Sequence, residues 1–258
     1  MLDIAIQAVR AAGAIQLSHF SNPLQVDDRK HHDIKLEVDR LSEEKILSIV
    51  RTAFPDHGVL AEESGRSDRP SKYVWIIDPL DGTVNYAHRV PHFCSSVALW
   101  ENGEPLVGAV YDAYRDELFA AERGKGATLN GKPIHVSTIE RVEECFVACG
   151  FMKTQVTIQK GLERFVKLVP RAQKMRVMGA SALDQCYVAS GRFDVYVEYG
   201  IKPWDVGAGT LVIREAGGRV DLGEGPEGGY DVLATNGLLH KTIREILNES
   251  EKMGSRNT

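Results

Sequence analysis

Two aspartates at the end of an apolar run are the residues of this chain whose types and spacing could do chemistry. Asp78 and Asp81 follow Trp75-Ile76-Ile77, which has the β-branched and aromatic character of a buried strand. A proline between them fixes φ, and Gly82 lets the backbone approach a ligand closely. Two carboxylates on one rigid turn can share a hard cation such as Mg²⁺, which prefers oxygen ligands. If a helix begins near Thr83, the N–H groups of Gly82 and Thr83 would also face a bound phosphate.

The same local sequence would suit a solvated acidic turn, so other segments must decide between the two interpretations. Ala61-Glu62-Glu63-Ser64-Gly65 and Asp33-Ile34-Lys35-Leu36-Glu37-Val38-Asp39 lie upstream, and Trp204-Asp205-Val206-Gly207-Ala208-Gly209 lies far downstream. Together with the central stretch, these segments resemble the inositol monophosphatase family. That family belongs to a superfamily of Mg²⁺-dependent, lithium-sensitive phosphatases that includes fructose-1,6-bisphosphatase. The resemblance covers nearly the whole chain, with the motifs in the expected order.

The resemblance implies a set of ligands for two Mg²⁺ ions. The first ion would be held by Glu62, Asp78 and the backbone carbonyl of Leu80. The second would be held by Asp78, Asp81 and Asp205, so that Asp78 bridges the two. A third, weaker ion near Glu62 also belongs to the family pattern. These residues are too far apart in sequence to form a local motif, and only the fold can assemble them.

Hydrolysis of a phosphate monoester also needs an activated water in line with the leaving group. By the resemblance, the catalytic residues are Thr83, Asp39 and Glu62. The Thr83 hydroxyl would orient the water on the first metal, and Asp39 would accept its proton or a hydrogen bond. Threonine is also a good helix N-cap, and Asp39 could equally cap the helix expected to begin there. Both interpretations stay open for each residue.

Substrate recognition is expected from the second half of the chain. Glu198 precedes Trp204-Asp205 at the spacing at which family members place a glutamate that accepts hydrogen bonds from sugar or inositol hydroxyls. A Gly-Ala-Ser turn matches a segment that borders the same pocket, and two basic residues could serve a second anionic group or a polar rim. An exposed charge on a helix or turn is the alternative for each. The candidates are Glu198, Ser181, Ala180, Gly179, Arg176 and Lys202.

The most upstream motif departs from the family pattern. Family members usually carry a lysine a few residues before its first aspartate, whereas Arg29 and Lys30 stand at a shifted spacing here. Lys35-Leu36-Glu37 also occupies positions where small or hydroxyl residues are common. We interpret His31 and His32 as solvated loop residues. The contribution of this loop to phosphate binding is therefore left open.

Composition places the chain among ordinary globular proteins, since 43% of its 258 residues are hydrophobic and 26% are charged. The net charge of −5 argues against general nucleic-acid binding, which draws on clustered positive charge. Local cations such as bound metal would then have to hold an anionic substrate. The sequence shows neither a basic leader with an apolar core nor a run of about 18 apolar residues. We therefore expect a cytoplasmic protein that does not interact with membranes.

The four cysteines are sparse and sit among apolar neighbours, as buried reduced thiols do. A metal role for Cys145 and Cys149 lacks a second Cys/His pair at zinc-finger spacing. The cysteines are therefore interpreted as core residues, namely Cys94, Cys145, Cys149 and Cys186.

Apolar periodicity and turn residues predict alternating blocks of helices and strands, which indicate layered α and β structure. Asn102-Gly103 and Asn130-Gly131 are hairpin signals, and the Gly-rich run 124–131 lacks the spacing of a nucleotide-binding loop. A loop or hairpin is expected over 24–38. Helices are expected over 1–20, 39–54, 155–170, 181–190, after Trp204-Asp205 as far as Glu215, and over 237–248. Strands are expected over 59–61, 73–77, 93–100, 105–112, 116–122, 145–149, 193–198, 219–222 and 231–235.

The resemblance sharpens this pattern to an α+β fold, a five-layered αβαβα sandwich of the inositol monophosphatase / fructose-1,6-bisphosphatase type. We expect one compact unit made of two lobes. Residues 1–140 would form an N-terminal metal- and phosphate-binding lobe. Residues 141–258 would form a C-terminal lobe that completes the metal site and the substrate pocket.

The function implied is Mg²⁺-dependent hydrolysis of a small phosphorylated polyol, with myo-inositol 1-phosphate as the default substrate. Histidinol phosphate, fructose 1,6-bisphosphate and adenosine 3′,5′-bisphosphate are alternatives, because one fold hosts all of these activities. A regulatory or RNA-associated binding protein that has lost the activity is the alternative of another class. The complete set of acidic motif residues argues against it. Lithium inhibition and a homodimer are further expectations from the family.

Overall fold

The computed structural model describes residues 1–22, 26–30, 33–67 and 69–249, without the side chains of 26–30 and 33–35. The expectations for the side chains of Arg29, Lys30 and Lys35, and for His31 and His32, therefore lie outside the described residues. Among the described residues, no helix is long and apolar enough to cross a membrane.

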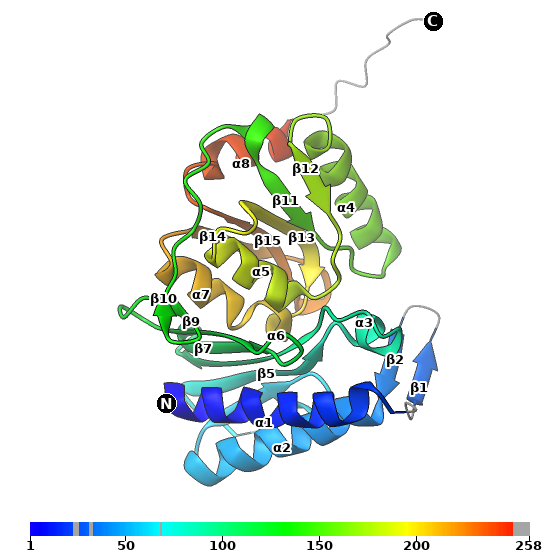
Figure 1. The fold of residues 1–258 in the computed structure, drawn as a ribbon, viewed down its shortest axis with the longest axis vertical. Coiled ribbons are helices and arrows are strands. Elements are labelled where there is room, and N and C mark those ends of the chain that lie inside the picture. The colour runs from blue at the N-terminus through cyan, green and yellow to red at the C-terminus, as the bar shows by residue number, and fades with distance from the viewer. Residues whose placement is uncertain (23–25, 31–32, 68, 250–258) are drawn as a thin grey trace, which may run out of the picture.

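Five layers of secondary structure follow one another along the long axis of the molecule (Figure 1). Helices α1 (Leu2–Phe20) and α2 (Glu37–Ala53) cover the outer face of an eight-stranded sheet. The middle layer contains α5 (Ser181–Ala189), α6 (Pro203–Val206) and α7 (Gly209–Glu215). A five-stranded sheet follows, and α4 (Gln155–Leu168) and α8 (His240–Asn248) form the last layer. The expected αβαβα sandwich is confirmed.

The eight-stranded sheet is antiparallel except where β3 runs parallel to β5. Its hairpins turn at Asn102-Gly103 and Asn130-Gly131, where all four residues have positive φ, as the sequence signals predict. In spatial order its strands are β10 (Lys132–Pro133), β9 (Ala127–Leu129), β8 (Glu117–Glu122), β7 (Glu104–Asp112), β6 (Cys94–Glu101), β5 (Tyr73–Asp81), β3 (Gly58–Ala61) and β4 (Gly65–Arg66).

In the five-stranded sheet, β11 runs parallel to both of its neighbours and the other pairs are antiparallel. Its spatial order is β12 (Lys174–Arg176), β11 (Phe146–Cys149), β13 (Val195–Ile201), β15 (Tyr230–Thr235) and β14 (Arg219–Glu224). The predicted lobe boundary near residue 140 falls between the two sheets in the chain. The remaining elements are the hairpin β1 (Val26–Lys30) and β2 (Asp33–Leu36), the short helix α3 (Thr83–Ala87), and the 3₁₀ turns η1 (Val142–Glu144) and η2 (Pro226–Gly228).

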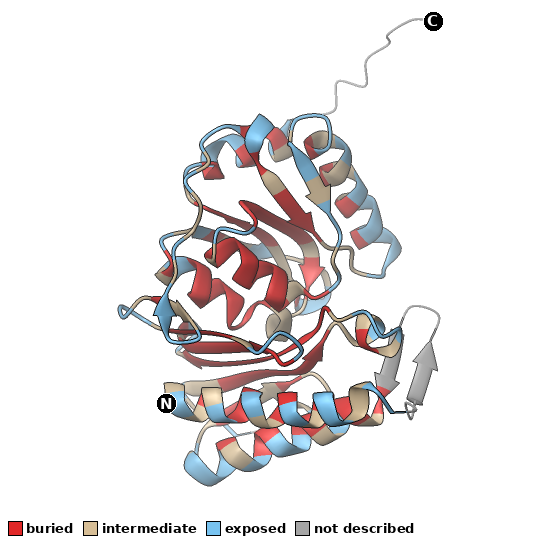
Figure 2. Cartoon of the chain, viewed as in Figure 1, coloured by how far each residue is buried: buried red, intermediate tan, exposed pale blue. Residues whose placement is uncertain are grey.

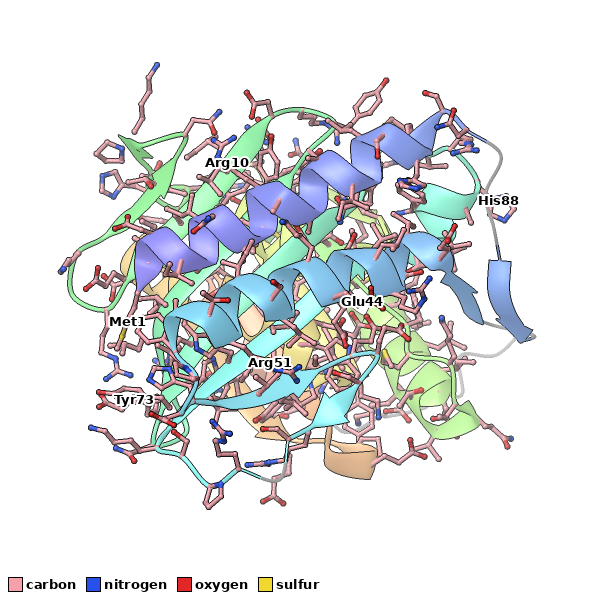
Figure 3. All side chains as sticks on the ribbon, turned by 90° about the horizontal axis from the view of Figure 1, so that it is seen from below. Met1, Arg10, Glu44, Arg51, Tyr73 and His88 are labelled. Carbon is pink, nitrogen blue, oxygen red and sulfur yellow. The ribbon has the colours of Figure 1, made fainter. Side chains whose placement is uncertain are left out.

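The residues of each helix and sheet that face a neighbouring layer are buried (Figure 2), and they form the hydrophobic clusters of the core. Helix α1 packs closely on its sheet because its inward residues are small, and a Cβ at Gly13 would lie 2.6 Å from the Tyr111 ring. Viewed from the side of α1 and α2, Arg10, Glu44 and Arg51 lie on the solvent face of these helices (Figure 3). The polar outer face and the apolar inner face follow from the helical spacing of the sequence.

Two further features of the fold bear on the sequence expectations. The helix expected after Trp204-Asp205 is α7, and a separate short helix that was not expected, α6, precedes it. The indole N–H of Trp100 donates to the carbonyl oxygen of Gly207 at 3.1 Å, which gives this carbonyl a partner outside the helix where the two helices separate. The four cysteines are buried and free, as expected.

Candidate active site

A β-bulge at the end of β5 brings two acidic side chains to one place. Residues three apart in a regular strand point to opposite faces of the sheet. In the pairing of β5 with β6, however, Asp78 lies opposite Ser96 and Asp81 opposite Cys94, so that β5 contains one extra residue. An extra residue re-aims the side chains that follow it. Proline at position 79 has no N–H to lose from the ladder, which suits this interruption.

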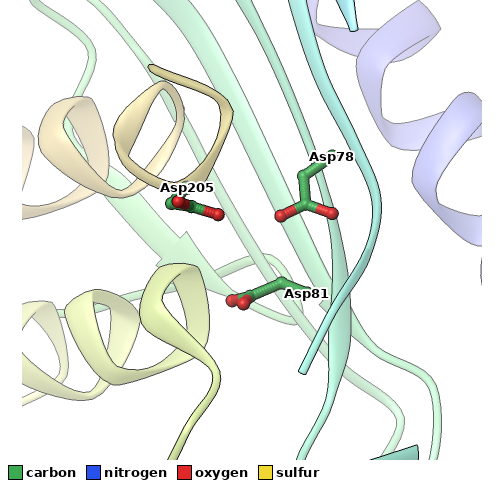
Figure 4. Close-up of side chains that lie close together, drawn as sticks. All are labelled: Asp78, Asp81 and Asp205. Carbon is green, nitrogen blue, oxygen red and sulfur yellow. The ribbon is translucent and has the colours of Figure 1, made fainter. Parts of the chain in front are cut away.

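Three carboxylates form a compact cluster at this bulge (Figure 4). Asp78 and Asp81 come from the end of β5, and Asp205 comes from α6 on the opposite side of the cavity. One oxygen of each lies within 4.8 Å of the others. The sequence motifs that carry these residues lie more than a hundred positions apart, so packing of α6 against β5 assembles the cluster.

Burial raises the pKa of each clustered carboxyl group, and repulsion by neighbouring carboxylates adds to the shift at Asp78 and Asp205. The pKa of Asp78 lies well above its usual range because the group is desolvated and faces Glu62, Asp81 and Asp205. The pKa values of Asp81 and Asp205 are also raised, again chiefly by burial. Buried like charges of this kind are unfavourable unless a cation compensates them. The donor set consists of hard oxygens, and it therefore fits Mg²⁺.

Glu62 lies beside the cluster, and the backbone around it is held by a residue that the sequence reasoning missed. Burial and the charge of Asp205 raise the pKa of Glu62 well above its usual range. The buried carboxylate of Glu43 in α2 accepts hydrogen bonds from the N–H groups of Glu63 at 2.9 Å and Ser64 at 2.8 Å. Glu43 therefore fixes the turn that directly follows Glu62. Its position one helical turn after Asp39 was the only sequence signal.

Thr83 and Asp39 make the contact that the sequence motifs predict. The Thr83 hydroxyl can donate to Oδ1 of Asp39 at 3.3 Å or to the carbonyl oxygen of Leu80 at 2.9 Å. Since a hydroxyl has one proton and two lone pairs, it can accept a hydrogen bond from water while it donates to either oxygen. Asp39 Oδ2 also accepts from Leu36 N–H at 2.6 Å, so Asp39 caps α2 as well. Thr83 is the first residue of α3 and its N-cap is Gly82.

Backbone N–H groups from the C-terminal half of the chain orient Asp81 and Asp205. Asp81 Oδ2 accepts a hydrogen bond from Ala182 N–H at 2.7 Å, at the start of α5. Asp205 Oδ2 accepts from Lys202 N–H at 3.0 Å, at the start of α6. Gly82 has φ 89°, and a Cβ there would lie 3.2 Å from the Ala180 Cβ. A small residue at this position therefore lets the two halves of the site approach each other.

A cavity of about 480 Å³ opens over the carboxylate cluster. It is lined by ten of the residues selected from the sequence, namely Glu62, Asp78, Leu80, Asp81, Gly82, Thr83, Gly179, Ser181, Glu198 and Asp205. Lys202 is an eleventh residue selected from the sequence that lines this cavity. A larger hollow of about 640 Å³ lies along α4 and includes only one acidic residue, Glu163. We assign the chemistry to the smaller cavity because the acidic cluster lies there.

Glu198 on β13 supplies a buried carboxylate on the C-terminal side of the cavity. Its Oε2 accepts hydrogen bonds from the hydroxyl groups of Ser181, at 3.2 Å, and Tyr196. Burial raises the pKa of Glu198 to about 7, although both hydroxyls oppose this shift. Because both donors contact Oε2, the other oxygen is left to bind a ligand.

The structure does not bring every predicted residue to the cavity. Arg176 is exposed on β12, its guanidinium lies 5.2 Å over the Phe146 ring, and it is not among the described residues that line the cavity. Ala180 is buried behind the lining, where its carbonyl oxygen accepts from Asp184 N–H. Asp39 contacts the site through Thr83. Strand β12 was not anticipated, so the direction of Arg176 was not predictable.

Several cavity residues were not selected from the sequence. Asn85 donates through Nδ2 to the carbonyl oxygens of His92 at 2.9 Å and Met178 at 2.8 Å, and so connects the two halves of the chain. Asp184 lines the cavity and pairs with the buried His92 at 3.0 Å. The segment after β11 also lines it and includes Gly150 and Lys153. The motif Gly-Thr-Val-Asn contains Asn85, and its position one turn after Gly82 was the available signal.

Comparisons with known proteins identify the family and agree with the fold. The family model described as "Inositol monophosphatase family" matches residues 1–252. The solved structure of inositol monophosphatase from Anabaena (Nostoc) sp. PCC 7120 has a TM-score of 0.85 and 40% sequence identity. The comparison covers 95% of this chain and 94% of that one.

Two similar sequences have different names. "Nus factor SuhB" from Pasteurella multocida is 38% identical over 96% of this chain and 95% of its own length. "Fructose-1,6-bisphosphatase/inositol-1-monophosphatase" from Aquifex aeolicus is 38% identical over 95% of this chain and 94% of its own length. The names diverge while the sequence similarity extends over almost all of each chain. Both the match over residues 1–252 and the shared fold thus lead to one conclusion, that this chain belongs to the inositol monophosphatase family, a family of phosphatases.

Proposed function

We propose that this protein is a Mg²⁺-dependent phosphatase that hydrolyses a small phosphorylated polyol, with myo-inositol 1-phosphate as the first substrate to test. The observation that carries the proposal is the cluster of Asp78, Asp81 and Asp205 within 4.8 Å, at the floor of the cavity. The family supports the reaction class, since the solved Anabaena relative is named an inositol monophosphatase. The names of relatives differ too much to fix the substrate.

Two ions would be held by the ligands that the family pattern assigns, with Asp78 shared between them. Glu62 and the Leu80 carbonyl would complete one set, and Asp81 and Asp205 the other. A third ion near Glu62 belongs to the same proposal. When bound, Mg²⁺ supplies the positive charge that neutralises the phosphate oxygens and lowers the barrier to attack by water. The raised pKa values of Glu62 and Asp78 support this role, because they reflect first the burial of these carboxyl groups and then the negative charge of their neighbours.

The residues of the chain then have separate tasks. We propose that Thr83 accepts a hydrogen bond from the attacking water while its own proton is directed to Asp39. A pKa of about 7 lets Asp39 take up a proton near neutral pH, and burial is the main cause of that value. The backbone at Gly82 and Thr83 would contact the phosphate. On the opposite wall, Glu198 would accept hydrogen bonds from substrate hydroxyls, beside Ser181 and Gly179.

The test is phosphate release from a panel of substrates with Mg²⁺ and with EDTA. The panel contains myo-inositol 1-phosphate, histidinol phosphate, fructose 1,6-bisphosphate and adenosine 3′,5′-bisphosphate. We expect turnover that requires Mg²⁺ and is highest in kcat/KM for inositol 1-phosphate. Preference for another member of the panel would correct the substrate and leave the reaction class intact. Equal activity in EDTA would refute the metal mechanism.

A regulatory binding protein is the second candidate, and one observation favours it: the similar Pasteurella multocida protein is named a Nus factor. The complete acidic set argues for retained catalysis, because a site without activity has no use for several buried like charges. Asp78→Asn separates the two functions. Loss of Mg²⁺-dependent turnover in this variant supports the enzyme, whereas a wild-type protein without turnover on the whole panel supports the binding function.

Three expectations accompany this proposal and stay predictions, one from the family and two from the sequence. These are the homodimer, the cytoplasmic location and the absence of nucleic-acid binding. Size-exclusion chromatography with light scattering tests the first, and a nucleic-acid binding assay at physiological salt tests the third. Of the two basic candidates, we favour Lys202 for substrate binding because it lines the cavity and Arg176 does not.

A further inference from the structure

Gly150 lies beside the carboxylate of Glu198 because their strands pair. Strand β11 ends at Cys149, which lies opposite Val197 in the parallel pair of β11 and β13. Gly150 continues this pairing, since its N–H donates to the carbonyl oxygen of Val197 at 3.3 Å. The next residue along each strand is therefore Gly150 on one side and Glu198 on the other. Both line the cavity.

The carboxylate of Glu198 occupies the space that a side chain at position 150 would need. A Cβ built on Gly150 would lie 2.0 Å from Oε2, 2.3 Å from Cδ and 2.6 Å from Oε1 of Glu198. The φ of Gly150 is outside the left-handed region, so the backbone here does not require glycine. The remaining physical reason for a glycine at position 150 is the space that the Glu198 carboxylate occupies.

Neither partner can move aside without losing contacts. The hydroxyl groups of Tyr196 and Ser181 hold Oε2 of Glu198. On the other side, the ring of Phe151 packs over Gly161 of α4, where an added Cβ would lie 2.6 Å from the ring. This packing fixes the backbone directly after Gly150. A methyl group at position 150 would therefore displace the end of the Glu198 side chain, which is the more flexible partner.

We propose that Gly150 is a specificity-determining residue of this cavity. Its missing side chain gives the Glu198 carboxylate the one position from which Oε1 accepts hydrogen bonds from hydroxyl groups of a neutral polyol moiety. Gly150 does not touch the reacting atoms, and it acts through Glu198 as a positioning residue. The inference rests on the proposed phosphatase function. It adds the residue that positions the Glu198 carboxylate as the hydrogen-bond acceptor for substrate hydroxyl groups.

The experiment compares Gly150→Ala with wild type on two substrates. Myo-inositol 1-phosphate presents hydroxyl groups to Glu198, whereas p-nitrophenyl phosphate presents none. The loss of kcat/KM for the inositol ester should exceed the loss for the aryl ester by about tenfold or more, mostly through KM. Gly223→Ala is the matched control. It lies in the same sheet, and its added Cβ would make only ordinary contact, 3.4 Å from Asp231 Cβ.

A double-mutant cycle tests whether Gly150 acts through Glu198. In the Glu198→Ala background the carboxylate is absent, so adding Gly150→Ala should cost no further kcat/KM and no further thermal stability. Additive losses, equal losses on both substrates, or no change in Gly150→Ala would each overturn the proposal. If Gly150→Ala alone fails to fold, the double variant should fold with the Tm of Glu198→Ala.

The same cycle separates this inference from the proposed function. A wild-type protein without turnover on either ester refutes the phosphatase. The Tm values of the four proteins still measure whether removing Glu198 relieves the substitution at Gly150. Recovery of Tm in the double variant supports the contact, and a Tm as low as that of Gly150→Ala refutes it.

Discussion

The Thr83 hydroxyl lies 3.3 Å from Oδ1 of Asp39, which joins the first turn of α3 to the first turn of α2. This contact places a hydroxyl and a carboxyl group with a pKa of about 7 at the edge of the acidic cluster. The pair can orient a water and receive a proton, and neither task needs a residue from the C-terminal half.

The first prediction concerns this pair. Thr83→Ala should lower kcat by about a hundredfold or more, because the water loses its oriented acceptor. KM should change much less. Thr83→Ser keeps the hydroxyl and should recover most of the activity. Phosphate-release kinetics give the result, and equal kcat values for the alanine variant and wild type would remove Thr83 from the mechanism.

The second prediction is that a substitution in the carboxylate cluster stabilises the metal-free protein. Asp205→Asn removes one buried like charge and keeps an acceptor for Lys202 N–H, so Tm in EDTA should rise by a few degrees. Turnover with Mg²⁺ should fall by about a hundredfold or more. Differential scanning calorimetry with EDTA and with Mg²⁺ measures both states.

Asp56→Asn, at an exposed position, is the control for the cluster substitution and should change neither quantity. Wild type should gain stability from added Mg²⁺ by mass action, about 2.7 kcal/mol at a hundred times the dissociation constant. If Asp205→Asn is less stable than wild type in EDTA, repulsion between the buried carboxylates does not destabilise the metal-free protein, and the prediction is wrong.

The third prediction tests the support of Glu62 by Glu43. Glu43→Gln replaces one acceptor oxygen by an NH₂ group that faces a backbone N–H of Glu63 or Ser64. The turn after Glu62 should shift, and the Mg²⁺ concentration for half-maximal activity should rise by about tenfold. Glu44→Gln, on the exposed side of the same helix, should leave it unchanged. An unchanged Mg²⁺ requirement in Glu43→Gln would show that the turn after Glu62 keeps its conformation without the hydrogen bonds to Glu43.

The fourth prediction concerns the pH dependence of stability without metal. The pKa values of Asp39 and Glu198 are raised to about 7 in the folded protein, chiefly by burial. Between their unfolded values, about 4, and 7, the native state therefore binds more protons than the unfolded chain. The free energy of unfolding should fall as pH rises through this range.

Urea unfolding in EDTA at pH 5 and at pH 8 measures this slope, and the protein should be more stable at the lower pH. Asp39→Asn should make the slope shallower, since its side chain does not titrate. A metal-free protein that gains stability between these two pH values would show that the carboxyl groups are less buried than the structure indicates.

The fifth prediction is inhibition by lithium, which the family resemblance implies. Li⁺ is a small hard cation that can compete for carboxylate oxygens, so concentrations on the order of millimolar should lower turnover at limiting Mg²⁺. Na⁺ at the same ionic strength is the control. A rate that responds equally to both salts would indicate screening of charge rather than occupation of the site.

Local sequence predicted the helices, strands and turns better than it predicted the tertiary contacts between them. Hairpins at Asn102-Gly103 and Asn130-Gly131 follow from turn chemistry alone, and the long helices follow from apolar periodicity. The break between α6 and α7 involves a hydrogen bond from Trp100, more than a hundred residues away in the chain. A one-dimensional pattern does not contain such a contact.

The candidate site shows the same limit. Asp78 and Asp81 are only three residues apart in sequence, yet their common direction depends on a bulge against β6. From the sequence, Asp205 could be assigned to the same site only by the family resemblance. Glu43 and Gly150 were missed because their roles depend on the register of neighbouring backbone. Arg176 was selected by charge, and the edge strand that carries it turns it over Phe146 instead.

The bulge between Asp78 and Asp81 also makes the length of this segment a constraint on evolution. Deleting a single residue there would repair the ladder with β6, improve the local hydrogen bonding, and turn one aspartate to the opposite face of the sheet. Such a deletion would yield a better-paired sheet without an acidic pocket. Among descendants of this gene, substitutions in this segment can weaken the acidic pocket by degrees. An insertion or deletion of one residue would instead remove the pocket altogether.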